Sequence, residues 1–308
     1  MVMSVGRSMS PAAYTRICWI ALVLLCTIVV TGAAVRLTGS GLGCSDWPKC
    51  NSEKFIDVST GHGAIEQVNR LFTGFVAAGV IAAVLAARRR SPYRRDLVVL
   101  SWGLVIGVLA QVVLGGIVVL TGLHPLANMG HFALSMVLVA NALVLVRRST
   151  RPDEGCTART VDSPQNLLIR LVVLLGTMAA VTGTVVTGTG PHDGDEEAPR
   201  FGFDISHVAR IHGITVIATL VACLVLAVTL RRNLVHKAPV TALEGVVAIG
   251  FVQAAIGYVQ YFNGVPALLV GFHILGATLF FLALVNLWTS ATQIVDNRDN
   301  VSRNSVMV

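Results

Sequence analysis

The amino-acid sequence predicts an all-α integral membrane protein whose eight transmembrane helices form two pseudo-symmetric four-helix bundles. Of the 308 residues, 54% are hydrophobic and only 13% are charged, and the mean hydropathy is +0.74, which is typical of membrane proteins. Eight apolar stretches are long enough to cross a hydrocarbon layer about 30 Å thick. The two halves of the chain also repeat one another, which predicts two similar bundles.

The eight stretches follow one another with short connections. The first lacks a small-residue cleavage site, so we interpret it as a retained helix and not as a signal peptide. The stretches cover 17–35, 65–87, 97–120, 128–146, 167–188, 207–230, 240–261 and 267–289. We expect an N-terminal bundle at 1–148, a cytoplasmic linker at 149–166, a C-terminal bundle at 167–291 and a disordered cytoplasmic tail at 292–308.

The repeat is visible at residues that carry chemistry. A Gln-x-x-x-Gly pattern at 111–115 recurs at 253–257, and in each half a histidine follows the glutamine by 20 residues, at His131 and His273. Asn69 in the second stretch corresponds to His212 in the sixth. Four spans per half give both halves the same orientation, so we expect a symmetry axis along the membrane normal.

The net charge of +7 reflects membrane topology, not binding to nucleic acid. Seventeen of the 23 basic residues fall in segments that share one side of the membrane if the N-terminus is inside. The other six are Arg36, Lys49, Lys54, Arg70, Arg200 and Arg210. Since cytoplasmic segments are enriched in lysine and arginine, we expect a cell-membrane protein with both termini in the cytoplasm.

Cys44 and Cys50 lie in the first outer loop, close enough for a turn through Gly43 and Pro48 to bring them together. On the oxidising side of a membrane such a pair favours a disulfide. A purely structural staple and a role in chemistry are equally compatible with it.

Glu66, Asn69 and Arg70 share one face of the second predicted helix because they are spaced i, i+3 and i+4. Polar groups at that depth are costly unless they meet a partner, a cavity or a cofactor. The simpler alternative is an interfacial Glu66–Arg70 pair in which the arginine extends toward water.

His212 and His273 are the strongest chemical signal in the residues themselves. Both begin helices of the C-terminal bundle at matching depth, and His131 is their counterpart in the other bundle. This pattern favours a haem iron held by two imidazoles. The alternatives are hydrogen bonds between packed helices and a zinc site, which would lack the cysteine or carboxylate ligands that complete a tetrahedron.

The loop from Leu37 to Cys50, LTGSGLGCSDWPKC, resembles the first outer loop of the haem A synthases. The segment 65–70 (IEQVNR), the turn 120–122 before His131, and His212 with His273 also fall where that family has functional residues. The similarity extends over nearly all of 17–289. It implies oxidation of the C8 methyl group of haem O to the formyl group of haem A, for cytochrome oxidase.

The resemblance also implies a haem b cofactor on His212 and His273, and a substrate-haem site in the N-terminal bundle near His131. There we expect Glu66 to be catalytic, by passing protons or by stabilising positive charge at the methyl carbon.

Asn69, Arg70 and Arg36 complete the predicted substrate site, with the arginines placed to pair with haem propionates. Many members of the family have histidine where this chain has Asn69, which leaves His131 as the main axial candidate. A second cysteine pair that some members carry in the third outer loop is absent from this sequence.

Two other function classes fit the same residues. One is a di-haem b protein that oxidises quinol and transfers electrons without chemistry on haem. The other is a transporter that uses Glu66 and Arg70. The partners we expect are haem O as substrate, membrane lipid, and a quinone or another electron acceptor. A haem O synthase partner and a homo-oligomer are both compatible with the sequence.

Overall fold

The computed structural model describes residues 8–153, 156–232 and 237–295, and long helices account for most of them. In this part of the chain, eight helices are long and apolar enough to cross a membrane, which confirms the predicted all-α membrane class. The helices are α1 (Pro11–Leu37), α2 (Gly61–Arg89), α3 (Arg95–Leu120), α4 (Pro125–Ser149), α5 (Ser163–Thr189), α6 (Ile205–Arg232), α7 (Lys237–Phe262) and α8 (Ala267–Ser290). Two short strands, β1 (Cys156–Arg159) and β2 (Thr292–Val295), complete the fold.

The helices extend beyond the apolar runs because polar residues cap them. Ser10 and Thr60 precede α1 and α2, and each accepts a hydrogen bond from a backbone N–H of the first turn, at 3.3 and 3.0 Å. At the other end, α1 and α3 stop at turns that contain Gly39 and Gly122, with φ of 64° and 61°. Glycine adopts this left-handed conformation without steric cost, so the chain reverses within a few residues.

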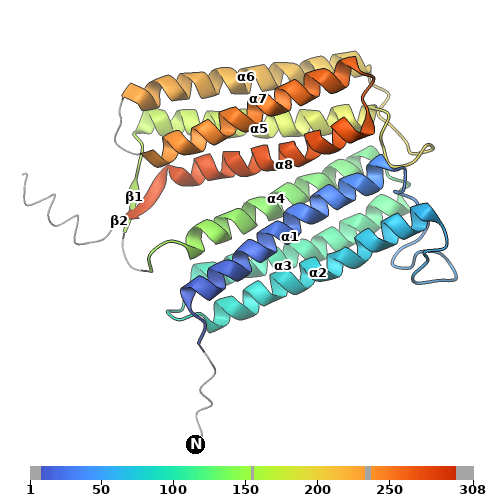
Figure 1. Cartoon of the computed structure of the whole chain (residues 1–308), viewed down its shortest axis with the longest axis horizontal. Helices are drawn as coiled ribbons and strands as arrows, with labels where there is room; N and C mark the ends of the chain where they lie inside the picture. Colours follow the sequence, from blue (N-terminus) through green and yellow to red (C-terminus); the bar gives the residue numbers. More distant parts are fainter. Residues whose placement is uncertain (1–7, 154–155, 233–236, 296–308) are drawn as a thin grey trace, which may run out of the picture.

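The helices form two bundles of four, as the sequence predicts (Figure 1). In the first, α1 and α3 each pack against α2 and α4, and in the second, α5 and α7 each pack against α6 and α8. Each bundle has its own buried core. The first is built around residues such as Tyr14, Leu97 and Leu145, and the second around residues such as Ile169, Leu226 and Leu284.

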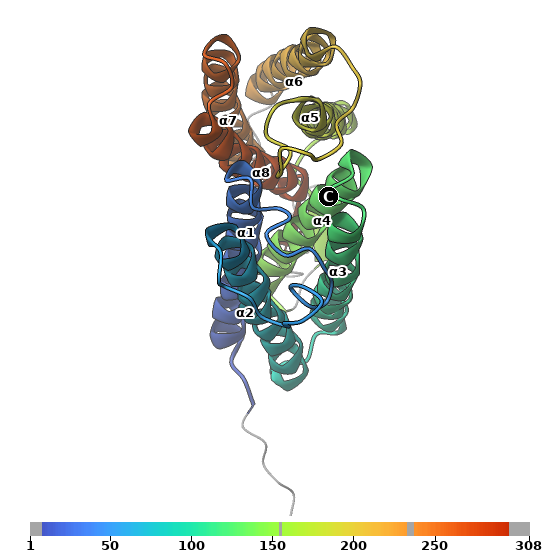
Figure 2. The ribbon, with the colours of Figure 1, turned by 90° about the vertical axis from the view of Figure 1, so that its right-hand side faces the viewer.

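The contact between the bundles has the symmetry that the repeat predicts. The helix pairs that meet across it are α4 with α8, α1 with α8, and α4 with α5. A twofold axis that exchanges the halves converts α4–α8 into itself and α1–α8 into α5–α4. This is the pattern of an isologous interface, in which both partners use the same surface. Figure 2 shows α4 and α8 at the centre of this contact.

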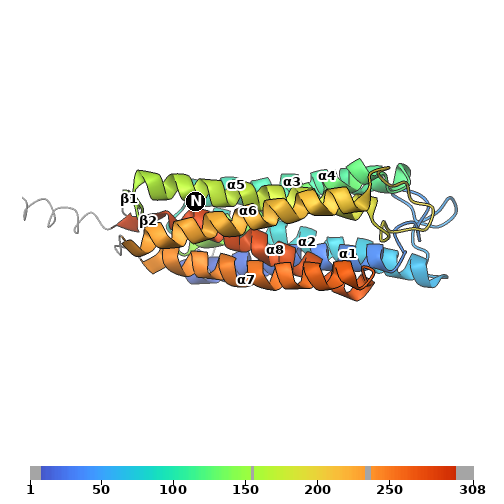
Figure 3. The ribbon, with the colours of Figure 1, turned by 90° about the horizontal axis from the view of Figure 1, so that it is seen from above.

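All eight helices run along one axis, so the molecule has two ends (Figure 3). We call the end that carries the α1–α2 and α5–α6 connections the disulfide end, and the opposite end, with β1 and β2, the strand end. The α2–α3 turn lies at the strand end, where Arg90 is buried and pairs with Asp153 at 2.6 Å. Arginines 88, 89, 94, 95, 147, 148 and 151 also lie in or beside helix termini at this end.

The strand end is more ordered than the sequence predicts. The sequence predicts a disordered tail from residue 292, whereas Thr292–Val295 pairs antiparallel with Cys156–Arg159 of the linker. The backbone N–H of Thr160 also donates to the carbonyl oxygen of Ala291 at 3.0 Å. These bonds join the linker to the end of α8. Residues 1–7 of the predicted N-terminal unit and 296–308 of the predicted tail lie outside the described residues.

Candidate functional site

A cavity of about 650 Å³ lies in the C-terminal bundle. All four helices of that bundle line it, and α4 of the other bundle contributes residues such as Met129 and Phe132. Glycines on α5 and α7 (Gly183, Gly250 and Gly257) widen it. Its volume is in the range of small-molecule and cofactor sites, which are mostly apolar with a few polar groups.

His212 of α6 and His273 of α8 both line this cavity, and their ring centres are 6.5 Å apart with perpendicular ring planes. Metal–imidazole bonds are about 2 Å long, as at zinc. Two rings that share one axial metal therefore have centres roughly 6 Å apart. Because each ring plane contains its own metal–nitrogen bond, perpendicular planes are compatible with a shared axis. The spacing fits ligation of one haem iron by both imidazoles.

The surroundings of His212 support a ligand role. The hydroxyl of Thr182 lies 3.2 Å from its Nδ1, which leaves Nε2 for a metal. Ligating histidines characteristically have such a partner on the second ring nitrogen. An added Cβ on Gly183 would lie 3.2 Å from Cε1 of His212, so glycine at 183 makes room for the ring. Nδ1 of His273 is buried and has no hydrogen-bond partner among the described residues.

The N-terminal bundle repeats part of this arrangement around His131. A Cβ on Gly115 would lie 3.4 Å from Cε1 of His131, and a Cβ on Gly257 would lie 3.3 Å from Cε1 of His273. The repeated Gln-x-x-x-Gly pattern thus places a glycine beside an imidazole in each half. Gln111 Nε2 donates to the carbonyl oxygen of His131 at 3.0 Å. Oδ1 of Asn69 is buried without a partner in the described part of the chain.

Glu66 lies beneath the first loop and is only 5% exposed. Its Oε2 accepts a hydrogen bond from the backbone N–H of Cys44 at 2.7 Å, and its Oε1 accepts one from Arg70 Nε at 2.9 Å. Arg70 also donates from Nη1 to the carbonyl oxygens of Asp46 and Lys49, at 3.2 and 3.1 Å. The predicted Glu66–Arg70 pair therefore exists. One carboxylate oxygen holds the loop directly, and the other holds it through Arg70.

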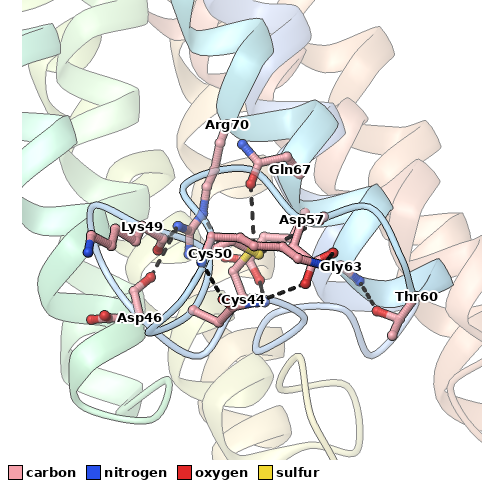
Figure 4. The surroundings of a disulfide bond; sticks show 12 residues. Cys44, Asp46, Lys49, Cys50, Asp57, Thr60, Gly63, Gln67 and Arg70 are labelled. Carbon is pink, nitrogen blue, oxygen red and sulfur yellow. Dashed lines mark hydrogen bonds and ion pairs between the residues drawn. A yellow bond between two sulfur atoms is a disulfide. The ribbon is translucent and has the colours of Figure 1, made fainter.

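Cys44 and Cys50 form a disulfide, which confirms the predicted pairing (Figure 4). Both residues are buried, and Arg70 reaches from α2 into the loop between them. Trp47 occupies a notch on α3, where a Cβ on Gly116 would lie 2.4 Å from the indole. The guanidinium of Arg70 lies 5.3 Å from the centre of the Trp47 ring, within cation–π range. The loop is thus attached to both α2 and α3.

Arg36 differs in placement from the sequence prediction, which assigns it to the N-terminal substrate site. It is carried by α1, but its side chain lines the cavity of the C-terminal bundle. Nη2 donates to Asp193 Oδ1 at 2.7 Å and to the carbonyl oxygen of Thr187 at 3.1 Å. Asp193 is fully buried, and burial raises the pKa of its carboxyl group, although Arg36 and Arg200 oppose that rise.

Three features of the site do not follow from the sequence pattern. They are the buried Asp193 beside Arg36, the hydrogen bond between Thr182 and His212, and the contact of Trp47 with α3. A usable signal existed only for the last, because Gly115 is followed by a second glycine at 116. Among the described residues, no group of three or more His, Cys, Asp or Glu side chains gathers as a metal site.

The fold and the site together define the class of protein. It is an integral membrane protein in which the eight described membrane-spanning helices form two similar four-helix bundles. The second bundle has a cavity lined by two histidines, and a loop closed by a disulfide covers the first. The comparison with known families identifies the protein further. A family model described as cytochrome oxidase assembly protein, COX15-CtaA, matches residues 15–60 and 55–192, and the chain belongs to that family.

Relatives of known name agree with this family. A protein named "Heme A synthase" from Bacillus pumilus (strain SAFR-032) is 36% identical over 123 residues, 38% of this chain and 39% of that protein. A protein of the same name from Geobacillus thermodenitrificans is 30% identical over 141 residues, which are 44% of this chain and 43% of that protein. A third, from Bacillus mycoides (strain KBAB4), is 28% identical over 179 residues, which are 54% of this chain and 56% of that protein. The chain thus spans about half the length of the curated relatives it matches.

Proposed function

We propose that the chain is a haem A synthase that oxidises the C8 methyl group of haem O to a formyl group and so supplies haem A to cytochrome oxidase. The conversion takes two successive two-electron oxidations, in which water supplies the oxygen and a quinone or another acceptor takes the four electrons. Family membership and the names of the relatives support this proposal. The observation that carries it is the pair of imidazoles, His212 and His273, whose ring centres lie 6.5 Å apart in a cavity of cofactor size.

In this proposal His212 and His273 hold haem b in the C-terminal bundle. When bound, haem b supplies one-electron redox chemistry at the membrane. Thr182 keeps Nδ1 of His212 occupied, so that Nε2 stays available to the iron. The apolar lining on α4 to α8 excludes water from the site and strengthens electrostatic interactions within it.

The N-terminal bundle is the proposed substrate site. His131 would hold the iron of haem O, and Asn69, a poor ligand for haem iron, would shape the substrate site. Such a weakly held axial position suits a substrate that must enter and leave. Glu66 is the proposed catalytic carboxylate, and Arg70 holds both Glu66 and the loop in place.

We further propose that the disulfide end faces outward and the strand end faces the cytoplasm. The arginines at the strand end satisfy the positive-inside rule in this orientation. The disulfide would then lie on the oxidising side of the membrane, where disulfides persist.

Haem analysis of single variants tests the proposal. His212→Ala and His273→Ala should each abolish the low-spin haem b spectrum of the purified protein, because each removes one axial ligand. His207→Ala is the matched control, since His207 also lies in the first part of α6 but its side chain is 73% exposed. A full spectrum in both ligand variants would refute the assignment. Chromatography of extracted haem should show haem A only in cells with the active protein.

The electron-transfer alternative is favoured by one observation. Both carboxylate oxygens of Glu66 are already partnered by the loop and Arg70, as in a purely structural residue. A di-haem electron carrier would contain haem b in both bundles. It would leave haem O unchanged in cells that express it, so the same extraction separates the two functions.

A further inference from the structure

Arginines gather where the C-terminal cavity reaches the disulfide end. Arg36 of α1 and Arg210 of α6 both line the cavity, and Asp193 of the α5–α6 connection lies between the bundles beside Arg36. Arg200, in the same connection, donates from Nη1 to the carbonyl oxygen of Gly190 at 2.7 Å. The lining of this end of the cavity thus contains two guanidinium groups and one carboxylate, so it carries net positive charge.

The hydrogen bonding of Arg36 is incomplete. Nη2 is used by Asp193 and by the carbonyl oxygen of Thr187. Nε is buried and has no partner among the described residues, and neither has Oδ2 of Asp193. A buried donor without a partner is unfavourable by about 1–3 kcal/mol. An oxygen-bearing group within the cavity would remove that penalty.

The shape and charge of the cavity together define its ligand. The body is apolar and bounded by two imidazoles, and the end at Arg36 and Arg210 is cationic. An amphiphile with a flat apolar body and carboxylate groups at one edge satisfies both. Guanidinium is well suited to carboxylates because its planar fork can donate two parallel hydrogen bonds.

We propose that Arg36, although it belongs to the N-terminal bundle, is the carboxylate anchor of the C-terminal cavity, and that it binds a propionate of the haem b held between His212 and His273. This inference rests on the proposed function, because it assigns a contact to that cofactor. Asp193 positions the guanidinium and competes with the propionate for it. Occupation of the cavity thus joins the two bundles at the disulfide end through α1.

A comparison of two haem forms isolates this contact. The full chain is produced in haem-deficient cells, purified in detergent and titrated with haem b or with its dipropionate dimethyl ester, and binding is followed by the low-spin absorbance. Wild-type protein should prefer the free acid by at least about tenfold, the lower limit for charge-assisted hydrogen bonds. In Arg36→Gln that preference should fall by about the same factor. Arg36→Lys should retain part of it, since lysine keeps the charge but not the fork.

Two further variants complete the design. Asp193→Asn should increase the preference for the free acid, because it removes the competing carboxylate. Arg170→Gln, on the exposed side of α5 toward the strand end, is the control and should match the wild type. An unchanged preference in Arg36→Gln, or no preference in the wild type, would overturn the inference. If Arg36→Gln does not fold, unchanged ratios in both Arg36→Lys and Asp193→Asn have the same meaning.

These outcomes are distinct from failure of the proposed function. If the wild type takes up neither form, or if His212→Ala and His273→Ala bind haem normally, the haem b site itself is wrong. If the wild type forms the low-spin complex with both forms equally well, the haem b site stands and only the role of Arg36 is refuted.

Discussion

Replacement of Glu66 by glutamine should loosen the first loop as well as remove a titratable group. The carboxylate accepts from the N–H of Cys44 with one oxygen and from Arg70 with the other. Glutamine has a single acceptor oxygen, so its amide group must turn NH₂ toward one of these two donors. In either orientation of the amide group, the NH₂ meets one of the two N–H donors, so that hydrogen bond is replaced by a donor–donor contact. The hydrogen bond to the amide oxygen remains but is no longer strengthened by a negative charge.

The magnitude follows from those two bonds. Hydrogen bonds to charged groups contribute about 1.5–3 kcal/mol each. Loss of one and weakening of the other should favour loop opening by about 2–4 kcal/mol. This corresponds to a roughly 30- to 1,000-fold change in the opening equilibrium. Little of the effect should be screened by salt, because the Glu66 and Arg70 side chains are only 6% and 14% exposed.

Hydrogen exchange measures this opening directly. Peptides that cover 44–50 should exchange faster in Glu66→Gln by the factor above, since amide exchange reports local opening free energies. Glu53→Gln, an exposed position in the same loop, is the control and should leave the rates unchanged. Unchanged exchange of 44–50 in Glu66→Gln would refute the role of Glu66 in holding the loop.

Comparison with Arg70→Gln separates the two roles of Glu66. That variant breaks the same ion pair but keeps the carboxylate. If Glu66 acts only by positioning the loop, both variants should lose haem A formation and both should show faster exchange. If Glu66 also carries protons or stabilises charge at the substrate, Glu66→Gln should lose far more activity than Arg70→Gln at comparable exchange rates.

Three further predictions concern neighbouring features. A membrane-impermeant thiol reagent should label Cys44 and Cys50 only after reduction; two reactive thiols in untreated cells would contradict the disulfide, which should contribute about 2 kcal/mol. Gly183→Ala should lower the haem b content of the purified protein, because the added methyl group crowds the His212 ring at 3.2 Å, whereas Gly245→Ala, with open space around it, should not. Asn69→His should retain haem A formation, as measured by extraction, and a complete loss would show that a second imidazole blocks the substrate site.

The repeat made much of the fold predictable from the sequence. Spans, bundle number and the symmetry between them follow from hydropathy and from the recurrence of glutamine, glycine and histidine at fixed spacing. The structure adds a physical reason for part of that recurrence, since Gly115 and Gly257 lie against the imidazoles of His131 and His273. Because close packing within each bundle requires the same glycine, the Gln-x-x-x-Gly pattern recurs in both halves and can be recognised in a single sequence.

Features that depend on how the bundles meet were not predictable in the same way. Arg36 and Asp193 are 157 positions apart and become partners only because α1 packs against α8. Apolar periodicity does not encode that lateral contact, so the sequence predicts Arg36 at a site in its own bundle. Likewise, the i, i+4 spacing predicted the Glu66–Arg70 pair, but the bond to Cys44 depends on the path of a loop that Trp47 attaches to α3.

The twofold arrangement of α1, α4, α5 and α8 at the contact between the bundles has a consequence for how the halves could diverge. An isologous surface is complementary to itself, so a single four-helix ancestor with this face could have formed a homodimer before the two copies were joined. Once fused, each copy was free to change its interior as long as the shared face was kept. Under the proposed function, the difference between Asn69 in one half and His212 in the other would be such a change, because it would give one site a transient substrate and the other a resident haem.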